Sequence, residues 1–150
     1  MNKVTINHNL YTQIAQLLQV ARKNVVRTVN QTMVYTYFEI GRMIVEDEQE
    51  GKERAEYGKQ VLKELSKRLS ADFGKGFSER NLEQMRQFYF AYSIPQTTSA
   101  KFTLSWSHYL KLMRMENLDE RRFYEIECAS NNWSLKELQR QFDSALYERL

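Results

Sequence analysis

The chain has 150 residues with 22 basic and 19 acidic side chains, so its formal net charge is only +3 at pH 7. A hydrophobic content of 42% and a charged content of 27% exclude a disordered chain, and one proline with five glycines argues against a turn-rich sheet protein. The single cysteine excludes an internal disulfide, and no apolar run reaches the ~18 residues of a membrane helix. Because the start shows no signal peptide, we expect a cytoplasmic protein.

Two helices are predicted before residue 50. Apolar side chains recur at helical spacing from about Asn9 to Val29, and a second pattern with a wider apolar face follows from Met33 to Val45. Gly41 lies inside the second pattern, where a glycine costs about 1 kcal/mol relative to alanine. A neighbouring helix that comes close to the backbone at Gly41 would compensate for this cost. A charged connection follows this helix.

Residues 64–92 have the pattern of a helix-turn-helix, which we expect the rest of the chain to support. A third helix with an apolar stripe ends at Phe73 and Gly74, because glycine adopts the left-handed C-cap conformation without a steric penalty. Ser78 is a natural N-cap for a fourth helix. A turn of about four residues with glycine between two helices is typical of this motif. The expected fold class is an all-α helical bundle of about six to seven helices.

The basic excess of the chain lies in the same region. Residues 59–86 contain seven basic and four acidic side chains, whereas residues 94–150 contain eight of each sign. A local concentration of positive charge is the electrostatic feature of a phosphate-binding surface. A solvated face of an ordinary helical hairpin is the alternative interpretation.

Polar residues of the fourth helix extend this prediction to base contacts. The apolar stripe of this helix is expected to comprise Leu82, Met85, Tyr89 and Tyr92, with Arg80, Gln84, Gln87 and Ala91 on the opposite face. Arginine and glutamine make bidentate contacts with guanine and adenine. Glu83 fits this face least well. Basic residues in the turn and on the third helix suit phosphates. The predicted contacts with duplex DNA are Arg80, Gln84, Gln87, Lys75, Lys67 and Arg68.

The remainder of the chain reads as a linker, residues 94–103, and a helical half, residues 104–150. Three helices are expected there, the first after Ser105 or Ser107, the second from Asn117, and the third after a capping box formed by Ser134 and Glu137. The last helix is expected to run to Leu150. Together with residues 1–93, this half is expected to form one cooperative domain.

The last helix also supports a second hypothesis, a protein-interaction or oligomerisation domain. Its apolar stripe includes Leu138 and Phe142, which are the predicted contacts of a homodimer. The two functions are compatible, since helix-turn-helix proteins commonly bind DNA as two-fold dimers.

Signals for catalysis are weak. The sequence has no P-loop, no dinucleotide-binding glycine motif and no Cys-x-x-Cys pair. Glu50-Gly51-Lys52 matches half of a nuclease metal motif, but no upstream aspartate on a strand accompanies it. Ser107 and His108 are adjacent on a predicted helix and so do not face each other. We therefore predict no catalytic residue, metal or cofactor, and no enzyme activity, for this chain.

Several motifs together resemble the N-terminal region of the YhcG-like family of PD-(D/E)XK nucleases. The resemblance covers nearly the whole chain in order. The matching stretches include Gly76-Phe77-Ser78, Asn81-Leu82, Met85-Arg86, Leu104-Ser105-Trp106-Ser107-His108-Tyr109, Glu120-Arg121-Arg122-Phe123-Tyr124 and Asn132-Trp133-Ser134-Leu135-Lys136-Glu137-Leu138. It implies a helical, DNA-binding part that longer members join to a C-terminal nuclease domain. Residues 1–150 show no complete nuclease motif, so the resemblance does not imply cleavage by this chain.

Overall fold

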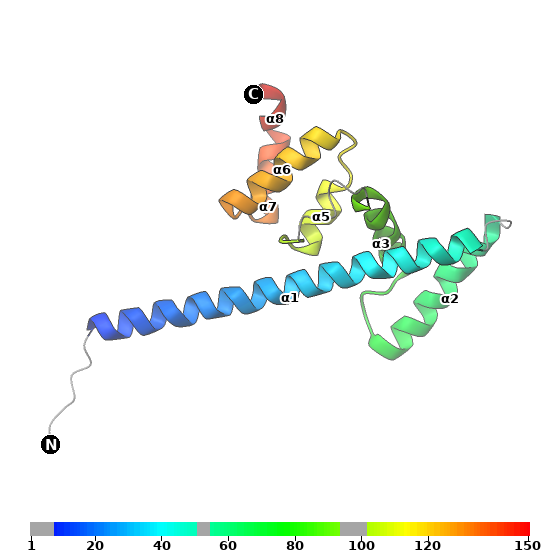
Figure 1. Cartoon of the computed structure of the whole chain (residues 1–150), viewed down its shortest axis with the longest axis horizontal. Helices are drawn as coiled ribbons and strands as arrows, with labels where there is room; N and C mark the ends of the chain where they lie inside the picture. Colours follow the sequence, from blue (N-terminus) through cyan, green and yellow to red (C-terminus); the bar gives the residue numbers. More distant parts are fainter. Residues whose placement is uncertain (1–7, 51–54, 94–101) are drawn as a thin grey trace, which may run out of the picture.

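The computed structural model describes residues 8–50, 55–93 and 102–150, and the secondary structure of these residues is entirely helical. This confirms the all-α expectation. No helix in the described ranges is long and apolar enough to cross a membrane. The helices are α1 (His8–Glu50), α2 (Ala55–Phe73), α3 (Glu79–Tyr92), α5 (Trp106–Leu112), α6 (Leu118–Asn131), α7 (Leu135–Asp143) and α8 (Leu146–Arg149) (Figure 1).

The prediction of two helices before residue 50 was wrong, because α1 is a single helix of 43 residues. No glycine or proline interrupts the stretch between Val29 and Met33, so the backbone has no reason to leave the helix there. What changes between the two patterns is the face that carries the apolar residues. The first part of α1 extends beyond the other helices, whereas α3 and α5 lie along its second part and α6, α7 and α8 lie beyond α5 (Figure 1).

The backbones of α1 and α3 come close together at Gly41. This glycine is buried, and a Cβ atom placed on it would lie only 2.1 Å from the carbonyl oxygen of Met85. The predicted compensation for this helical glycine is therefore confirmed. Around this crossing a small core forms from Ile44, Leu82 and Met85, and the apolar stripe of α2 packs against it.

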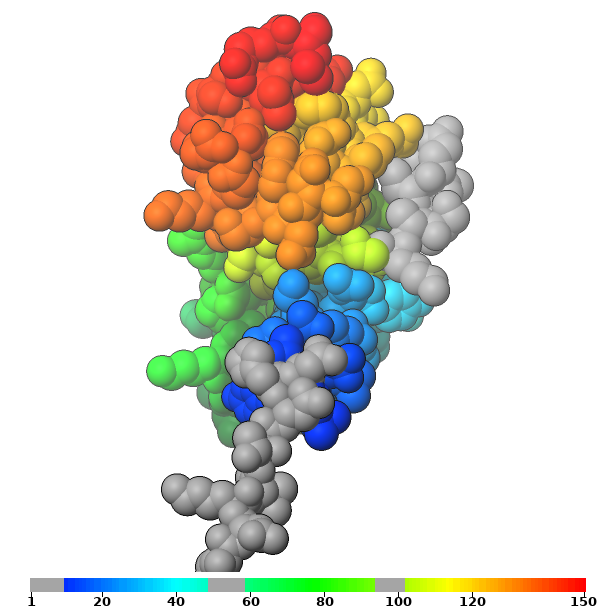
Figure 2. Space-filling model, turned by 90° about the vertical axis from the view of Figure 1, so that its left-hand side faces the viewer, coloured from blue at the N-terminus to red at the C-terminus, as the bar shows by residue number. Residues whose placement is uncertain are grey.

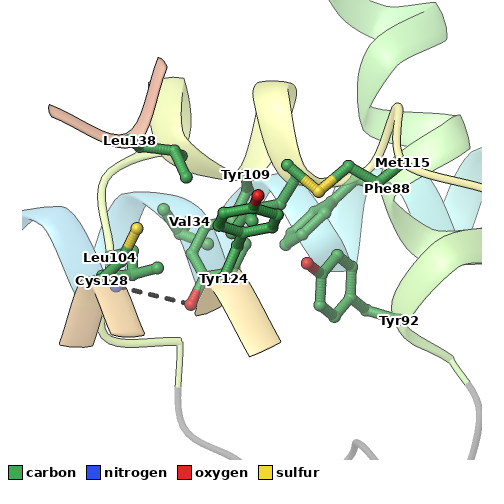
Figure 3. Packing of buried hydrophobic residues seen from close by; sticks show 10 residues of the cluster. Val34, Phe88, Tyr92, Leu104, Tyr109, Met115, Tyr124, Cys128 and Leu138 are labelled. Carbon is green, nitrogen blue, oxygen red and sulfur yellow. Dashed lines mark hydrogen bonds between the residues drawn. The ribbon is translucent and has the colours of Figure 1, made fainter. Parts of the chain in front are cut away.

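A larger core joins both halves of the chain. Phe88 of α3 is fully buried, and its ring centroid lies 5.0 Å from that of Trp106 and 5.3 Å from that of Tyr109. The cluster, most of which Figure 3 shows, comprises Val34, Phe88, Tyr92, Leu104, Tyr109, Leu112, Met115, Tyr124, Cys128 and Leu138. Because helices from both predicted halves contribute, the core is shared between them.

Two connections near the shared core are ordered by polar contacts. The hydroxyl of Tyr109 accepts hydrogen bonds from the backbone N–H groups of Thr103 and Leu104 at 3.1 and 3.4 Å. Phe102 also packs against the core, so the last two residues of the predicted linker belong to the folded body. The rest of that linker lies outside the described residues. Arg121 of α6 donates to four carbonyls, those of Leu112, Met113, Met115 and Ala91, and so ties α6 to the ends of α3 and α5.

The helix starts in the second half follow the predicted caps. The side chains of Ser105, Asn117 and Ser134 each accept a hydrogen bond from a backbone N–H in the first turn of α5, α6 and α7. The final helix, however, does not continue to Leu150 as predicted. It stops at Asp143, and Ala145 adopts a left-handed conformation with φ of 56° before α8 begins. This reversal lets Tyr147 donate its backbone N–H to the buried Tyr124 hydroxyl at 3.2 Å.

Candidate nucleic-acid interface

The connection between α2 and α3 is a short turn with two glycines in conformations that other residues rarely adopt. Gly74 has φ of +82° and Gly76 has φ of +108°, and a Cβ atom placed on either glycine would meet no other atom within 4 Å. Backbone conformation, not crowding, therefore requires glycine at both positions. The Ser78 hydroxyl then accepts from the backbone N–H of Asn81 at 3.1 Å, as predicted for the N-cap. Between the glycines, Lys75 is exposed to solvent.

Five of the six residues predicted to contact DNA are exposed, and the sixth is partly buried. Lys67 and Arg68 lie on the surface of α2, Lys75 is in the turn, and Arg80 and Gln87 lie on α3. Gln84 is half-buried. The ion pairs found among the described residues use other basic side chains, namely Arg42, Arg86 and Arg140.

The outward face of α3 is rotated from its predicted position. The fully buried side of α3 comprises Leu82, Met85, Phe88 and Tyr92, whereas Tyr89 is only half-buried. Phe88 thus takes the core position that the sequence pattern gives to Tyr89. Ala91, predicted on the outer face, packs against the core. The rotation turns Gln84 toward the protein and leaves Arg80 and Gln87 in solvent, so Gln84 is poorly placed for a base contact.

The side of α3 that adjoins α1 contains a cluster of opposite charges. The guanidinium of Arg86 forms an ion pair with Glu48 of α1 at 2.8 Å and another with Glu83 at 3.3 Å. It also lies 5.0 Å from the centre of the exposed Phe90 ring. These contacts hold α3 against α1. They also explain why a glutamate occupies position 83, which fitted the predicted interface least well. Its carboxylate forms an ion pair with Arg86.

A continuous line of positive charge lies on α2. Lys59, Lys63 and Lys67 are exposed and follow one another at a spacing of four residues, so they fall within about 80° of the helix surface and span about 12 Å. Of these three lysines, only Lys67 is among the DNA contacts predicted from the sequence. We call Lys59, Lys63 and Lys67 the basic line. Lys75 and Arg80 follow it in the turn and at the start of α3.

A second basic surface, which the sequence pattern did not predict, is an open groove of about 850 Å³ between α5 and α7. Its basic lining residues are Lys111, Arg114, Lys136 and Arg140. Arg140 is paired with Glu137 at 2.6 Å, and hydrogen bonds from Arg140 and Gln141 hold the pKa of Glu137 at about 2. The ammonium of Lys111 lies 4.6 Å from the centre of the Phe142 ring. Half of the basic groups in this groove thus already have partners within the chain.

The residues predicted for an oligomer interface are part of the folded body. Leu138 is fully buried in the large core, and Phe142 packs against that core with its ring centroid 5.7 Å from that of Tyr124. The apolar stripe of α7 therefore faces the chain's own interior. Leu138 cannot contact a second copy unless the core opens.

Residues considered for catalysis have structural partners. His108 does not pair with Ser107. Its Nδ1 lies 2.6 Å from the Ser105 hydroxyl and its Nε2 lies 2.8 Å from the carbonyl oxygen of Trp133, which links α5 to the start of α7. Cys128 is buried, and desolvation raises the pKa of its thiol to about 12. Within the ranges that the structure covers, no three His, Cys, Asp or Glu side chains converge as a metal site. Gly51 and Lys52 of the half-motif fall outside these ranges.

Comparisons with known proteins identify one family. The model of the family described as "DUF1016 N-terminal domain" matches residues 13–149. The chain is also 41% identical over 170 aligned positions to the protein named "Putative nuclease YhcG" of Escherichia coli (strain K12), in an alignment that covers 93% of this chain and 45% of the relative. The chain thus spans less than half the length of that relative. No solved structure matches the chain.

Proposed function

Since the chain belongs to the family of DUF1016 N-terminal domains, we propose that it binds duplex DNA, with the basic line of α2 as its main phosphate-binding surface. The observation that carries this proposal is the exposed row of Lys59, Lys63 and Lys67, followed by Lys75 and Arg80. The name of the relative, a nuclease, makes nucleic acid the natural ligand. The resemblance noted from the sequence also favours a DNA-binding role.

The distribution of charged side chains indicates that phosphate binds to α2 and the turn, not to the middle of α3. Duplex DNA carries one negative charge per about 1.7 Å of its axis, so a row of flexible lysine side chains can meet several phosphates at once. On α3, by contrast, Arg86 is paired with Glu83 and with Glu48 of α1, and these two carboxylates would repel a phosphate. We therefore assign phosphate contacts to the basic line and Lys75.

We assign base contacts to the exposed residues at the start and on the outer side of α3. Arg80 lies in the first turn and Gln87 lies two turns later, both in solvent. An arginine binds guanine and a glutamine binds adenine through paired hydrogen bonds. Arg80→Ala with Gln87→Ala is expected to reduce the preference among duplex sequences more than the affinity for mixed-sequence DNA.

We assign no catalytic step to this chain. In the proposed arrangement the domain holds DNA, and cleavage belongs to the C-terminal nuclease domain that the family resemblance implies in longer members. The proposed role is thus targeting of a nuclease, with affinity supplied by phosphate contacts.

Fluorescence anisotropy with labelled duplex DNA tests the proposal at low salt. The triple variant Lys59→Gln, Lys63→Gln, Lys67→Gln is expected to bind about 10- to 100-fold more weakly than the unmodified chain. The matched control removes the same charge from the groove between α5 and α7, through Lys111→Gln, Arg114→Gln and Lys136→Gln.

The control is expected to bind within a few-fold of the unmodified chain. A larger loss in the groove variant than in the basic-line variant would overturn the assignment of the surface. A chain that binds no duplex at low salt would overturn the function itself.

A further inference from the structure

The first part of α1 displays an apolar surface that no described part of the chain covers. Six aliphatic side chains on it are between 49% and 69% exposed, far more than aliphatic residues in a core. We call residues 10–32 the arm, and the six residues the apolar stripe. They are Leu10, Ile14, Leu17, Leu18, Val25 and Val29. Figure 2, which faces the N-terminal end of α1, shows the arm outside the C-terminal helices.

The apolar stripe is on the opposite side of α1 from the face that holds the body of the protein. At about 100° per residue, the six side chains fall within an arc of about 120°. Val34, Gly41 and Ile44, which face the body, are centred about half a turn away from this arc. The stripe is therefore not an extension of the core but a separate surface.

Threonines continue this surface toward the body without adding free hydroxyls. Thr28, Thr32 and Thr36 follow at intervals of four residues on the same side of α1. Each hydroxyl donates to the backbone carbonyl four residues earlier, at 2.9, 2.9 and 2.8 Å. With the hydroxyl directed at the backbone, the methyl group is left toward solvent. A partner could therefore bury this side of α1 without depriving the three threonine hydroxyls of their hydrogen bonds.

We propose that a second copy of the chain covers the apolar stripe, and that the two arms pair as antiparallel helices. Together with Tyr11, the half-exposed stripe offers roughly 600 Å² per copy, and flanking atoms bring this close to the ~800 Å² that each partner contributes to a stable interface. The apolar stripe itself contains no charged residue, so an identical stripe can cover it without any complementary charge.

The basic residues of the arm favour an antiparallel over a parallel pair of arms. Its charged residues are Arg22, Lys23 and Arg27, all basic. Parallel arms would place Arg22, Lys23 and Arg27 of one copy level with the same residues of the other, with no acidic residue between them. An antiparallel pair with Leu10 opposite Val29 places Arg22 opposite Leu17. It shifts the two copies of Arg22 by about 7.5 Å, and those of Arg27 by about 22 Å, along the helix axis. This pairing rests on no part of the proposed DNA-binding function.

Sedimentation of the 18.0 kDa chain across a concentration series tests the pairing. The unmodified chain is expected to reach twice the mass of one chain. The variant Ile14→Gln, Leu18→Gln, Val25→Gln is expected to remain at the mass of one chain, with its core unchanged because all three residues are exposed. The matched control on the opposite face of the arm, Gln16→Ala, Gln19→Ala, Lys23→Ala, is expected to dimerise normally.

A monomeric unmodified chain at every concentration overturns the proposal and leaves the stripe to another partner. Equal dimerisation of the stripe variant and the control also overturns it. Circular dichroism of each variant distinguishes a lost interface from a lost fold, because only the latter changes the melting of the body.

Disulfide trapping tests the orientation. In an antiparallel pair, a chain with Leu10→Cys is expected to cross-link to a chain with Val29→Cys. Two Leu10→Cys chains are expected not to cross-link, because their cysteines lie about 28 Å apart. The native Cys128 does not compete, since it is buried within the body. Efficient cross-linking of Leu10→Cys chains to each other would overturn the antiparallel arrangement.

Discussion

The substitution Gly41→Ala separates two opposing effects at the crossing of α1 and α3. In an isolated helix, alanine is favoured over glycine by about 1 kcal/mol, so helix propensity alone predicts a more stable protein. At this position, however, the new methyl group would lie 2.1 Å from the carbonyl oxygen and 2.8 Å from the carbonyl carbon of Met85. Both atoms belong to the backbone of α3, so no rotation of a side chain relieves the contact.

The distance that α3 must move away from α1 determines how much stability Gly41→Ala costs. Ordinary van der Waals contact begins near 3.4 Å, so α3 has to move away from α1 by more than 1 Å, taking Met85 and Phe88 with it. Overpacking of a core costs about 1–3 kcal/mol, and the shift also opens the aromatic contacts of Phe88. After the gain in helix propensity is subtracted, we expect the free energy of unfolding to fall by about 2 kcal/mol.

Urea denaturation followed by circular dichroism measures this change. Gln19→Ala is the matched control, because Gln19 lies on the same helix and is exposed. The control is expected to be neutral or slightly stabilising. If Gly41→Ala instead raises the free energy of unfolding by about 1 kcal/mol, the gain in helix propensity is not opposed by a steric cost. That result would refute the close crossing of α1 and α3.

Three further predictions concern stability. Burial raises the pKa of the Glu125 carboxyl, so the stability that its protonated form contributes is lost as the pH rises through that pKa. Glu125→Gln should therefore raise the Tm at neutral pH, and the difference in Tm between this variant and the unmodified chain should narrow toward about pH 4. A difference in Tm that does not change with pH would contradict this prediction. Arg86→Met leaves Glu48 without its partner and should cost about 2 kcal/mol in urea denaturation, whereas no loss would show that the ion pair is not needed. Ser78→Ala removes the N-cap of α3 and should cost about 1 kcal/mol, measured in the same way, with Ser78→Asn restoring most of it.

The features that the sequence predicted correctly are governed by residues close together in the chain. The caps at Ser78, Asn117 and Ser134 depend on a hydroxyl or amide that reaches a backbone N–H two or three residues later. Gly74 was identified for the same reason, since its left-handed conformation closes α2. Gly41 was also interpretable, because an otherwise unfavourable glycine in a helix indicates a close neighbour.

The errors arose where contacts distant in sequence decide between similar local choices. Phe88 and Tyr89 are adjacent aromatic residues, and contact with α1 and α5 selects Phe88 for the core. That selection rotates α3 and turns Gln84 away from solvent. The break at Ala145 has no local signal, because alanine favours a helix. The contacts that accompany the reversal, those of Leu146 and Tyr147 with the core and of Tyr147 with Tyr124, come from residues distant in sequence. The apolar pattern of the arm predicted a helix correctly but could not show that the folded body leaves this stripe exposed.

The salt dependence of DNA binding tests the proposed phosphate surface most directly. The slope of log affinity against log salt concentration counts phosphate contacts, at about −0.9 for each contact with duplex DNA. If Lys59, Lys63 and Lys67 each meet a phosphate, replacing all three with glutamine should reduce the magnitude of the slope by about 3. An unchanged slope for this variant, alongside binding by the unmodified chain, would contradict the assignment of the basic line to DNA.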